Sequence, residues 1–147
     1  MRKAAVLLLL FVTGCVSQMG SEEFIRGKGP YCFAVDFSDS LCTYDLALYS
    51  RIDAREKNIR AMGELPVTIV WTAPDGAGEF SESAFLPLDG ERRGYFSRQV
   101  WQRYRKGVKP SVYGEWTISV SIPDTVRVRG LRGMGLEVLR DYSDGAR

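Results

Sequence analysis

Cys15 follows a short apolar segment that has the layout of an export signal. Arg2 and Lys3 give a positive start, residues 4–12 (AAVLLLLFV) are apolar, and Thr13 and Gly14 lead into the cysteine. This order is typical of a secretory signal peptide. The run of nine apolar residues is too short for a membrane-spanning helix, which needs about 20. The pattern VTGC indicates a lipobox, which predicts cleavage after Gly14 and acylation of the Cys15 thiol. An ordinary signal peptide with an unrelated cysteine, or an uncleaved anchor, is the alternative.

The rest of the chain offers little catalytic chemistry. It contains no histidine, the commonest general base and metal ligand. Besides Cys15 the only thiols are Cys32 and Cys42, too few for a four-ligand zinc site. Neither a glycine-rich phosphate loop nor a GxSxG nucleophile motif occurs. Carboxylate pairs such as Asp36 and Asp39 lie in charged, turn-rich segments, where they are usually solvated. We therefore expect a protein that is not an enzyme and carries no cofactor or metal, only a covalent lipid on Cys15.

The charges are divided between the two halves of the chain. Residues 15–90 hold 12 acidic and 6 basic side chains, and residues 91–147 hold 6 acidic and 12 basic ones. The mature chain is therefore neutral overall, which removes the electrostatic argument for nucleic acid as a partner. One interpretation is that the halves pair their charges on folding. The other is that basic residues form a stripe facing a partner protein, lipid headgroups or an anionic glycan.

Aromatic and cationic side chains are interleaved around Trp101. The segment contains Arg103, Tyr104 and Arg105, a composition that can stack a sugar ring or hold arginine over an aromatic face. These four residues are the candidate contacts for a partner or a glycan. Binding to a glycan requires Trp101 and Tyr104 to be exposed on one concave face; packing is the favoured role for Trp101. Trp71 and Trp116, which lie among valine and isoleucine, are expected in the core.

Apolar and polar residues alternate along most of the chain after Pro30, which predicts β-strands. Turn sequences such as Ala73-Pro74-Asp75-Gly76 separate them. Short strands at this spacing predict a single antiparallel β-sandwich of about eight strands, an all-β fold. Residues 51–62 contain helix formers, and we expect a loop there with one turn of helix. The predicted strands are Tyr31–Phe37, Thr43–Ile52, Leu65–Thr72, Glu79–Leu86, Tyr95–Arg103, Gly107–Val112, Glu115–Ile122 and Gly133–Arg140.

The predicted export signal and strands divide the chain into four parts. Residues 1–14 form the signal peptide, 15–30 the lipidated N-terminus and a flexible tether, 31–142 the β-sandwich, and 143–147 a disordered tail. Export permits a disulfide, but strand alternation points Cys32 outward and Cys42 inward, so two free thiols are favoured over a Cys32–Cys42 bond.

Several segments resemble the GldH-type gliding-motility lipoproteins of the Bacteroidetes. The most specific are the run D-S-x-x-x-Y-D-L-x-L-x-x-R at 39–51 and G-L-x-x-M-G-L-E-V at 130–138, with a Pro-Asp-Gly turn at 74–76 and GEWTISV at 114–120 between them. The similarity extends over roughly residues 33–140. It implies a non-enzymatic envelope lipoprotein, an accessory or subunit of gliding-motility or secretion machinery whose partners are other envelope proteins. It implies no catalytic residues. A surface glycan-binding lipoprotein is the alternative function.

The residues after Cys15 bear on where the protein would be sorted. Val16, in place of an aspartate, disfavours retention in the inner membrane by analogy with other lipoproteins. Acidic residues soon after the lipidated cysteine can signal surface display, but Glu22 and Glu23 lie several positions later. We therefore expect a lipid anchor in the outer membrane with the domain facing the periplasm, and surface exposure as the second possibility.

Overall fold

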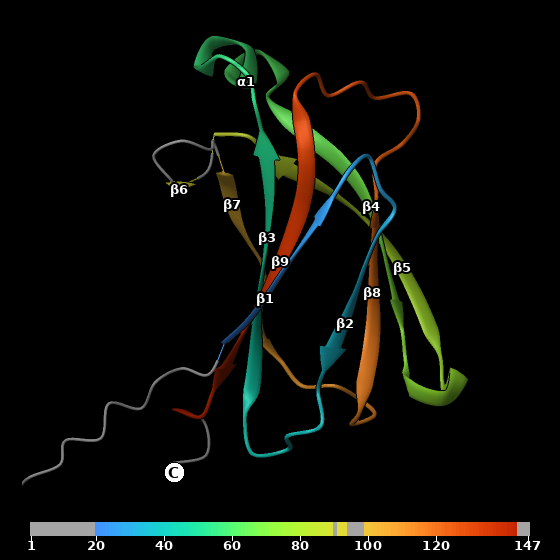
Figure 1. Ribbon diagram of the computed structural model, residues 1–147. Coiled ribbons are helices and arrows are strands. Elements are labelled where there is room, and N and C mark those ends of the chain that lie inside the picture. Colours follow the sequence, from blue (N-terminus) through green and yellow to red (C-terminus); the bar gives the residue numbers. More distant parts are fainter. Residues whose placement is uncertain (1–19, 90, 94–98, 144–147) are drawn as a thin grey trace, which may run out of the picture.

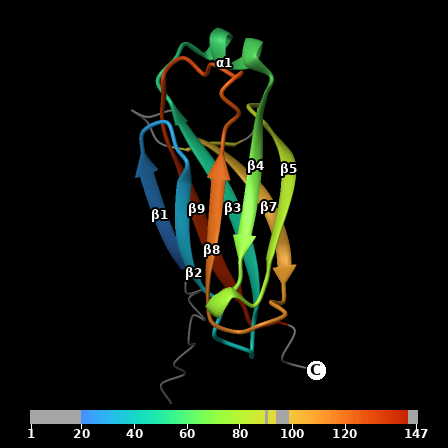
Figure 2. The same ribbon diagram turned by 90° about the vertical axis from the view of Figure 1, so that its right-hand side faces the viewer.

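The protein folds into two antiparallel β-sheets packed face to face, as the sequence predicts (Figures 1 and 2). The computed structural model describes residues 20–89, 91–93 and 99–143. One sheet has the strand order β1-β9-β3-β7-β6, and the other has the order β2-β8-β4-β5. The predicted signal peptide, Cys15 and residues 144–147 of the predicted tail lie outside the described residues. The elements are β1 (Gly20–Arg26), β2 (Tyr31–Asp36), β3 (Thr43–Ile52), α1 (Glu56–Met62), β4 (Glu64–Thr72), a 3₁₀ turn (Pro74–Gly76), β5 (Glu79–Pro87), β6 (Glu91–Arg93), β7 (Gln99–Val108), β8 (Glu115–Ser121) and β9 (Leu131–Asp141).

Because side chains alternate along a strand, every second one points into the core between the two sheets. Along β2, Tyr31, Phe33 and Val35 are buried while the residues between them are exposed, because successive side chains point to opposite faces. Cys32 is accordingly exposed and Cys42 buried, and both thiols are free. The core between the sheets also contains, from the other strands, Tyr44, Leu46, Leu48, Val67, Ile69, Trp71, Trp116, Ile118, Val120, Met134 and Leu136.

The first strand corrects the prediction of a flexible tether at residues 15–30. Residues 20–26 form β1, which pairs with β9 from Gly20 opposite Leu139 to Arg26 opposite Gly133. Ile25 lies opposite the fully buried Met134, and Phe24 stacks on Tyr49 at a ring-centroid distance of 5.8 Å. The sandwich therefore begins at Gly20, because these two apolar side chains and a full ladder of backbone hydrogen bonds hold β1 to the sheet.

Two other elements differ from expectation. Residues 107 and 108 continue β7, so the predicted separate strand at 107–112 does not form. Between β3 and β4 the chain makes a seven-residue helix, α1, rather than one turn in a loop. An ion pair between Arg60 and Glu56 one turn apart (3.2 Å) supports this helix. Its Ile59 is fully buried, so the helix closes one end of the core.

The two ends of the sandwich differ in charge. At the end drawn uppermost in Figure 1 lie α1, the β1–β2 turn and the β8–β9 connection. We call it the basic end, because it carries Arg26, Lys28, Arg55, Lys57, Arg60, Arg127, Arg129 and Arg132 alongside Asp53, Glu56, Glu64, Asp89 and Asp124. At the opposite end, where β1 begins, lie Asp36, Asp39, Asp75, Glu79, Glu115 and Asp141, with Lys106, Lys109 and Arg140. We call this the acidic end.

Buried tyrosines predict how stability depends on alkaline pH. Burial raises the pKa of Tyr44 to about 12 and also raises the pKa of Tyr31 and of Tyr49. A raised pKa means that the folded state favours the neutral phenol. The contribution of these phenols to the free energy of unfolding is therefore fully present below pH 10 and is lost as the pH rises above it. For Tyr44 alone the loss is on the order of 2 kcal/mol by pH 12. Urea unfolding between pH 8 and pH 11 should show this decline.

Two variants distinguish the contribution of Tyr44 to this decline from that of other groups that titrate at alkaline pH. Tyr44→Phe should flatten the decline above pH 10, although it also removes a hydrogen bond from the Tyr44 hydroxyl to the Asp39 carbonyl (3.0 Å). Tyr113→Phe, which removes the hydroxyl of a half-exposed tyrosine (50%), serves as the control for the loss of a hydroxyl group. An equal slope in Tyr44→Phe and in the unmodified protein would contradict the assignment.

Candidate functional site

The four residues predicted to contact a partner or glycan do not form one surface. On β3 and β7, Ala47 pairs with Arg103 whereas Leu46 pairs with Arg105. Tyr104 is therefore an extra residue in β7, a β-bulge that reverses the alternation beyond it. Trp101 and Arg103 consequently belong to the outer face of the five-stranded sheet. Tyr104 and Arg105 lie instead at the edge between the two sheets, where they contact Glu82 of β5.

Trp101 is a packing residue, not an exposed platform. It is only 7% exposed, and its ring stacks on Tyr49 with centroids 4.1 Å apart. Tyr49 in turn stacks on Phe24 and donates a hydrogen bond from its hydroxyl to Glu22 (2.7 Å). Trp101 therefore packs against the sheet, as favoured, and the joint exposure with Tyr104 that glycan binding requires is not met, because three aromatic rings cover one another across β1, β3 and β7.

Tyr104 and Arg105 close the open edge of the sandwich between β5 and β7. Tyr104 accepts a hydrogen bond from the Trp71 indole (2.9 Å) and donates one to Glu82. The Arg105 guanidinium binds the same carboxylate at 2.7 Å and lies 5.8 Å from the Trp71 ring. The buried positions of Trp71 and Trp116 (3% and 6% exposed) confirm that these tryptophans belong to the core. The polar groups of Trp71, Tyr104, Arg105 and Glu82 therefore bind one another within the cluster.

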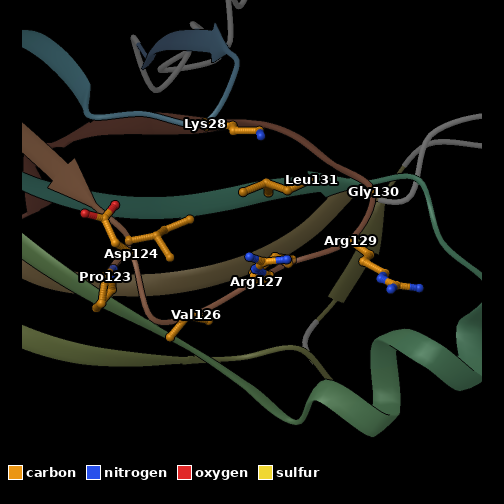
Figure 3. A pocket seen from close by; sticks show the side chains of 10 residues that line it. Lys28, Pro123, Asp124, Val126, Arg127, Arg129, Gly130 and Leu131 are labelled. Atoms are coloured by element: carbon orange, nitrogen blue, oxygen red, sulfur yellow. The ribbon is translucent and has the colours of Figure 1, made fainter.

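A hollow at the basic end is the strongest candidate for a binding site. It has a volume of ≈670 Å³ and lies between the β1–β2 turn and the connection from β8 to β9. Lys28 stands on one side, and Arg127 and Arg129 stand on the other (Figure 3). Asp124 lies toward the opposite end from Arg129 (Figure 3). Aliphatic groups line the rest, namely Ile122, Pro123, Val126, Val128 and Leu131.

The walls of this hollow are fixed to the sandwich by short contacts. The amide of Asp53 donates to the Gly130 carbonyl at 2.7 Å, and the amide of Gly27 donates to the Arg132 carbonyl at 3.0 Å. Arg132 also binds the Asp53 carboxylate at 2.7 Å. A Cβ atom at Gly130 would lie 2.3 Å from the Asp53 carbonyl oxygen, so only glycine permits this close approach. Both walls are therefore held in place next to β9.

The cations of the hollow differ from three other arginines of the second half. Arg105, Arg132 and Arg140 each pair with an acidic residue of the first half, at 2.7, 2.7 and 3.3 Å. These pairs agree with the interpretation that the halves neutralise one another on folding. Within residues 20–89, 91–93 and 99–143, no ion pair involves Lys28, Arg127 or Arg129. All three are exposed, so their charge is available to a ligand.

The sequence did contain a signal for this site. In Val126-Arg127-Val128-Arg129, aliphatic and cationic residues alternate as they do in a strand, yet the segment forms an irregular connection. The alternation places both aliphatic and cationic groups around one hollow. Lys28, about a hundred residues earlier, joins them only because β1 pairs with β9.

Two comparisons, with family models and with curated proteins, identify no relative. No model of a protein family matches the chain, and no curated protein is significantly similar to it.

Across the described residues, no three histidine, cysteine, aspartate or glutamate side chains are grouped to hold a metal ion. In the same part of the chain, every helix is too short or too polar to cross a bilayer.

Proposed function

We propose that this chain is a lipid-anchored, non-enzymatic lipoprotein of the bacterial cell envelope that serves as an accessory or subunit of a multiprotein machine. The observation that carries the proposal is the lipobox at Cys15, five positions before the first strand. The resemblance of residues 39–51 and 130–138 to GldH-type lipoproteins supports machinery for gliding motility or for the associated secretion. Val16 after the cysteine supports an outer-membrane anchor, and the late position of Glu22 and Glu23 supports a domain that faces the periplasm.

The position of the two ends supports a role in linking a membrane to a partner. β1 begins at the acidic end (Figure 1), and the hollow lies at the basic end. A lipid on Cys15 would therefore hold the acidic end at the membrane and direct the basic end away from it. Glu22, the first acidic residue after the cysteine, accepts a hydrogen bond from Tyr49. Its carboxylate thus contributes to the sheet, which favours a periplasmic location over surface display.

Crosslinking in living cells tests the proposed function. Cells that express the native protein are treated with a mild crosslinker, their membranes are dissolved in detergent, and the protein is recovered through a C-terminal tag. A defined set of envelope proteins should be recovered with it, and deletion of the gene should impair spreading or secretion. Recovery of the protein alone, with no phenotype of the deletion, would contradict the proposal. Protease treatment of intact cells tests orientation, because degradation without lysis would place the domain on the surface.

A further inference from the structure

We propose that the hollow at the basic end binds an extended acidic segment of a partner protein, with carboxylates held by Lys28, Arg127 and Arg129. This inference specifies the partner chemistry of the proposed function, on which it rests, but it does not depend on lipid attachment. A measurement of peptide binding therefore tests the hollow whether or not Cys15 is acylated.

Charge is the first argument for an acidic ligand. Three exposed cations surround the hollow from two separate segments of the chain, and among the described residues Asp124 is the only acidic one that lines it. The guanidinium groups of Arg127 and Arg129 present paired donors that match a carboxylate. Because the described residues supply no carboxylate to these cations, a ligand can bind them without first breaking an internal ion pair.

The lining of the hollow favours a peptide over a sugar. Ile122, Val126, Val128 and Leu131 supply aliphatic surface, and no aromatic ring is among the lining residues. Sugars usually stack on aromatic rings, whereas an aliphatic side chain between two carboxylates fits an aliphatic surface with a cationic rim. This composition therefore favours a segment in which acidic and aliphatic residues alternate.

The backbone of the β8–β9 connection favours an extended ligand. Among residues 123–130, the backbone hydrogen bonds within the described chain run from the Val126 amide to the Pro123 carbonyl, from the Leu131 amide to the Val128 carbonyl (3.4 Å) and from the Asp53 amide to the Gly130 carbonyl. The amides of Arg127 and Arg129 make no such bond. An extended peptide that lies along this connection can pair with these groups as well as with the side chains.

Binding of a synthetic peptide tests the inference. The probe is a fluorescently labelled decapeptide of alternating glutamate and valine, measured by anisotropy with the full-length protein in neutral detergent micelles at low salt. Arg127→Glu combined with Arg129→Glu should weaken binding by at least about tenfold, because each reversal replaces attraction by repulsion. Added salt should weaken binding to the unmodified protein, since the charges are exposed.

Matched controls distinguish the hollow from the general charge of this end. Lys57→Glu makes the same kind of charge change on α1, outside the hollow, and should alter binding by less than about twofold. A lysine and valine peptide should not bind. The inference is overturned if the glutamate peptide does not bind, or if Lys57→Glu weakens binding as much as the double variant. A circular dichroism spectrum checks that each variant is folded, and Arg127→Gln with Arg129→Gln replaces the double variant if it is not.

Two further probes separate a peptide from other anions. Inorganic phosphate at millimolar concentration should not displace the peptide, and vesicles of phosphatidylcholine with one-fifth phosphatidylglycerol should not compete with it. Displacement by either would overturn the peptide assignment in favour of a phosphate or a lipid headgroup. Failure of peptide binding together with successful crosslinking to envelope proteins would reject this inference and leave the proposed function standing.

Discussion

Replacing Cys15 by alanine is expected to abolish incorporation of a labelled fatty acid and to release the protein from the outer-membrane fraction. A single acyl chain binds a membrane only marginally, whereas the two or three chains of a processed lipoprotein anchor it stably. Without the Cys15 thiol there is no site for these chains. Metabolic labelling with an alkyne fatty acid, followed by fractionation of the envelope, measures both effects. The domain itself should fold normally, because the described sandwich begins at Gly20.

Cys32 provides the matched control for this experiment. It is an exposed free thiol on β2, so Cys32→Ala tests whether any accessible cysteine can take the label. The Cys32→Ala protein should be labelled and anchored as the unmodified protein is. Labelling that persists in Cys15→Ala, or is missing from the unmodified protein, would show that the lipobox prediction is wrong. Full rescue of a gene deletion by Cys15→Ala would show that anchorage is incidental to function.

Replacing Gly135 by alanine is expected to destabilise the fold by about 3 kcal/mol or more. A Cβ atom at this position would lie 2.0 Å from the Tyr49 ring. The ring cannot move aside easily, because it lies between Phe24 and Trp101 and its hydroxyl binds Glu22. Chemical denaturation monitored by tryptophan fluorescence measures the change. Gly20→Ala is the control on the neighbouring strand β1. There the new methyl would press only on the end of the flexible Leu139 side chain (2.7 Å), and the Val138 carbonyl oxygen at 3.5 Å is at ordinary contact distance, so the loss should stay below about 1 kcal/mol.

A double-mutant cycle shows whether the Tyr49 ring is the cause. Tyr49→Ala alone should cost about 3–5 kcal/mol, since it empties a buried position. Adding Gly135→Ala to that variant should cost less than about 1 kcal/mol, because the obstructing ring has gone. If Gly135→Ala costs as much in the absence of Tyr49 as in its presence, the destabilisation arises from the backbone of β9 and the packing explanation is wrong.

The sandwich could be predicted because its core strands alternate cleanly, as β2 does from Tyr31 to Asp36. β1 could not be predicted in the same way. Its sequence GSEEFIR is mostly polar, as is common for a strand at the edge of a sheet, and only its pairing with β9 reveals its role. The bulge at Tyr104 is a second case. A one-residue shift within β7 takes Arg105 off the face that Trp101 and Arg103 share, and the alternation of residue types along the sequence does not reveal such a shift.

The candidate site was missed for a related physical reason. Its cations come from Lys28 and from a connection that is not a strand, so no periodic pattern unites them. The predicted contact residues were placed in the basic segment around residues 98–109 because its charges are dense. In the structure, however, Arg105 is bound to Glu82. Charge density along the sequence indicates the second half, from which two of the three cations of the hollow come, but only the fold distinguishes paired from unpaired cations.

The pairing of β1 has a mechanical consequence for an anchored protein. Four residues separate Cys15 from Gly20, so the linker reaches at most about 17 Å. A partner that pulled on the basic end would put the domain under tension against its anchor. The load would enter at Gly20 and run along β1, across hydrogen bonds to β9 that lie perpendicular to it. All seven residue pairs would then resist together in shear instead of opening one after another, so the first strand would transmit force into the sheet before it detached.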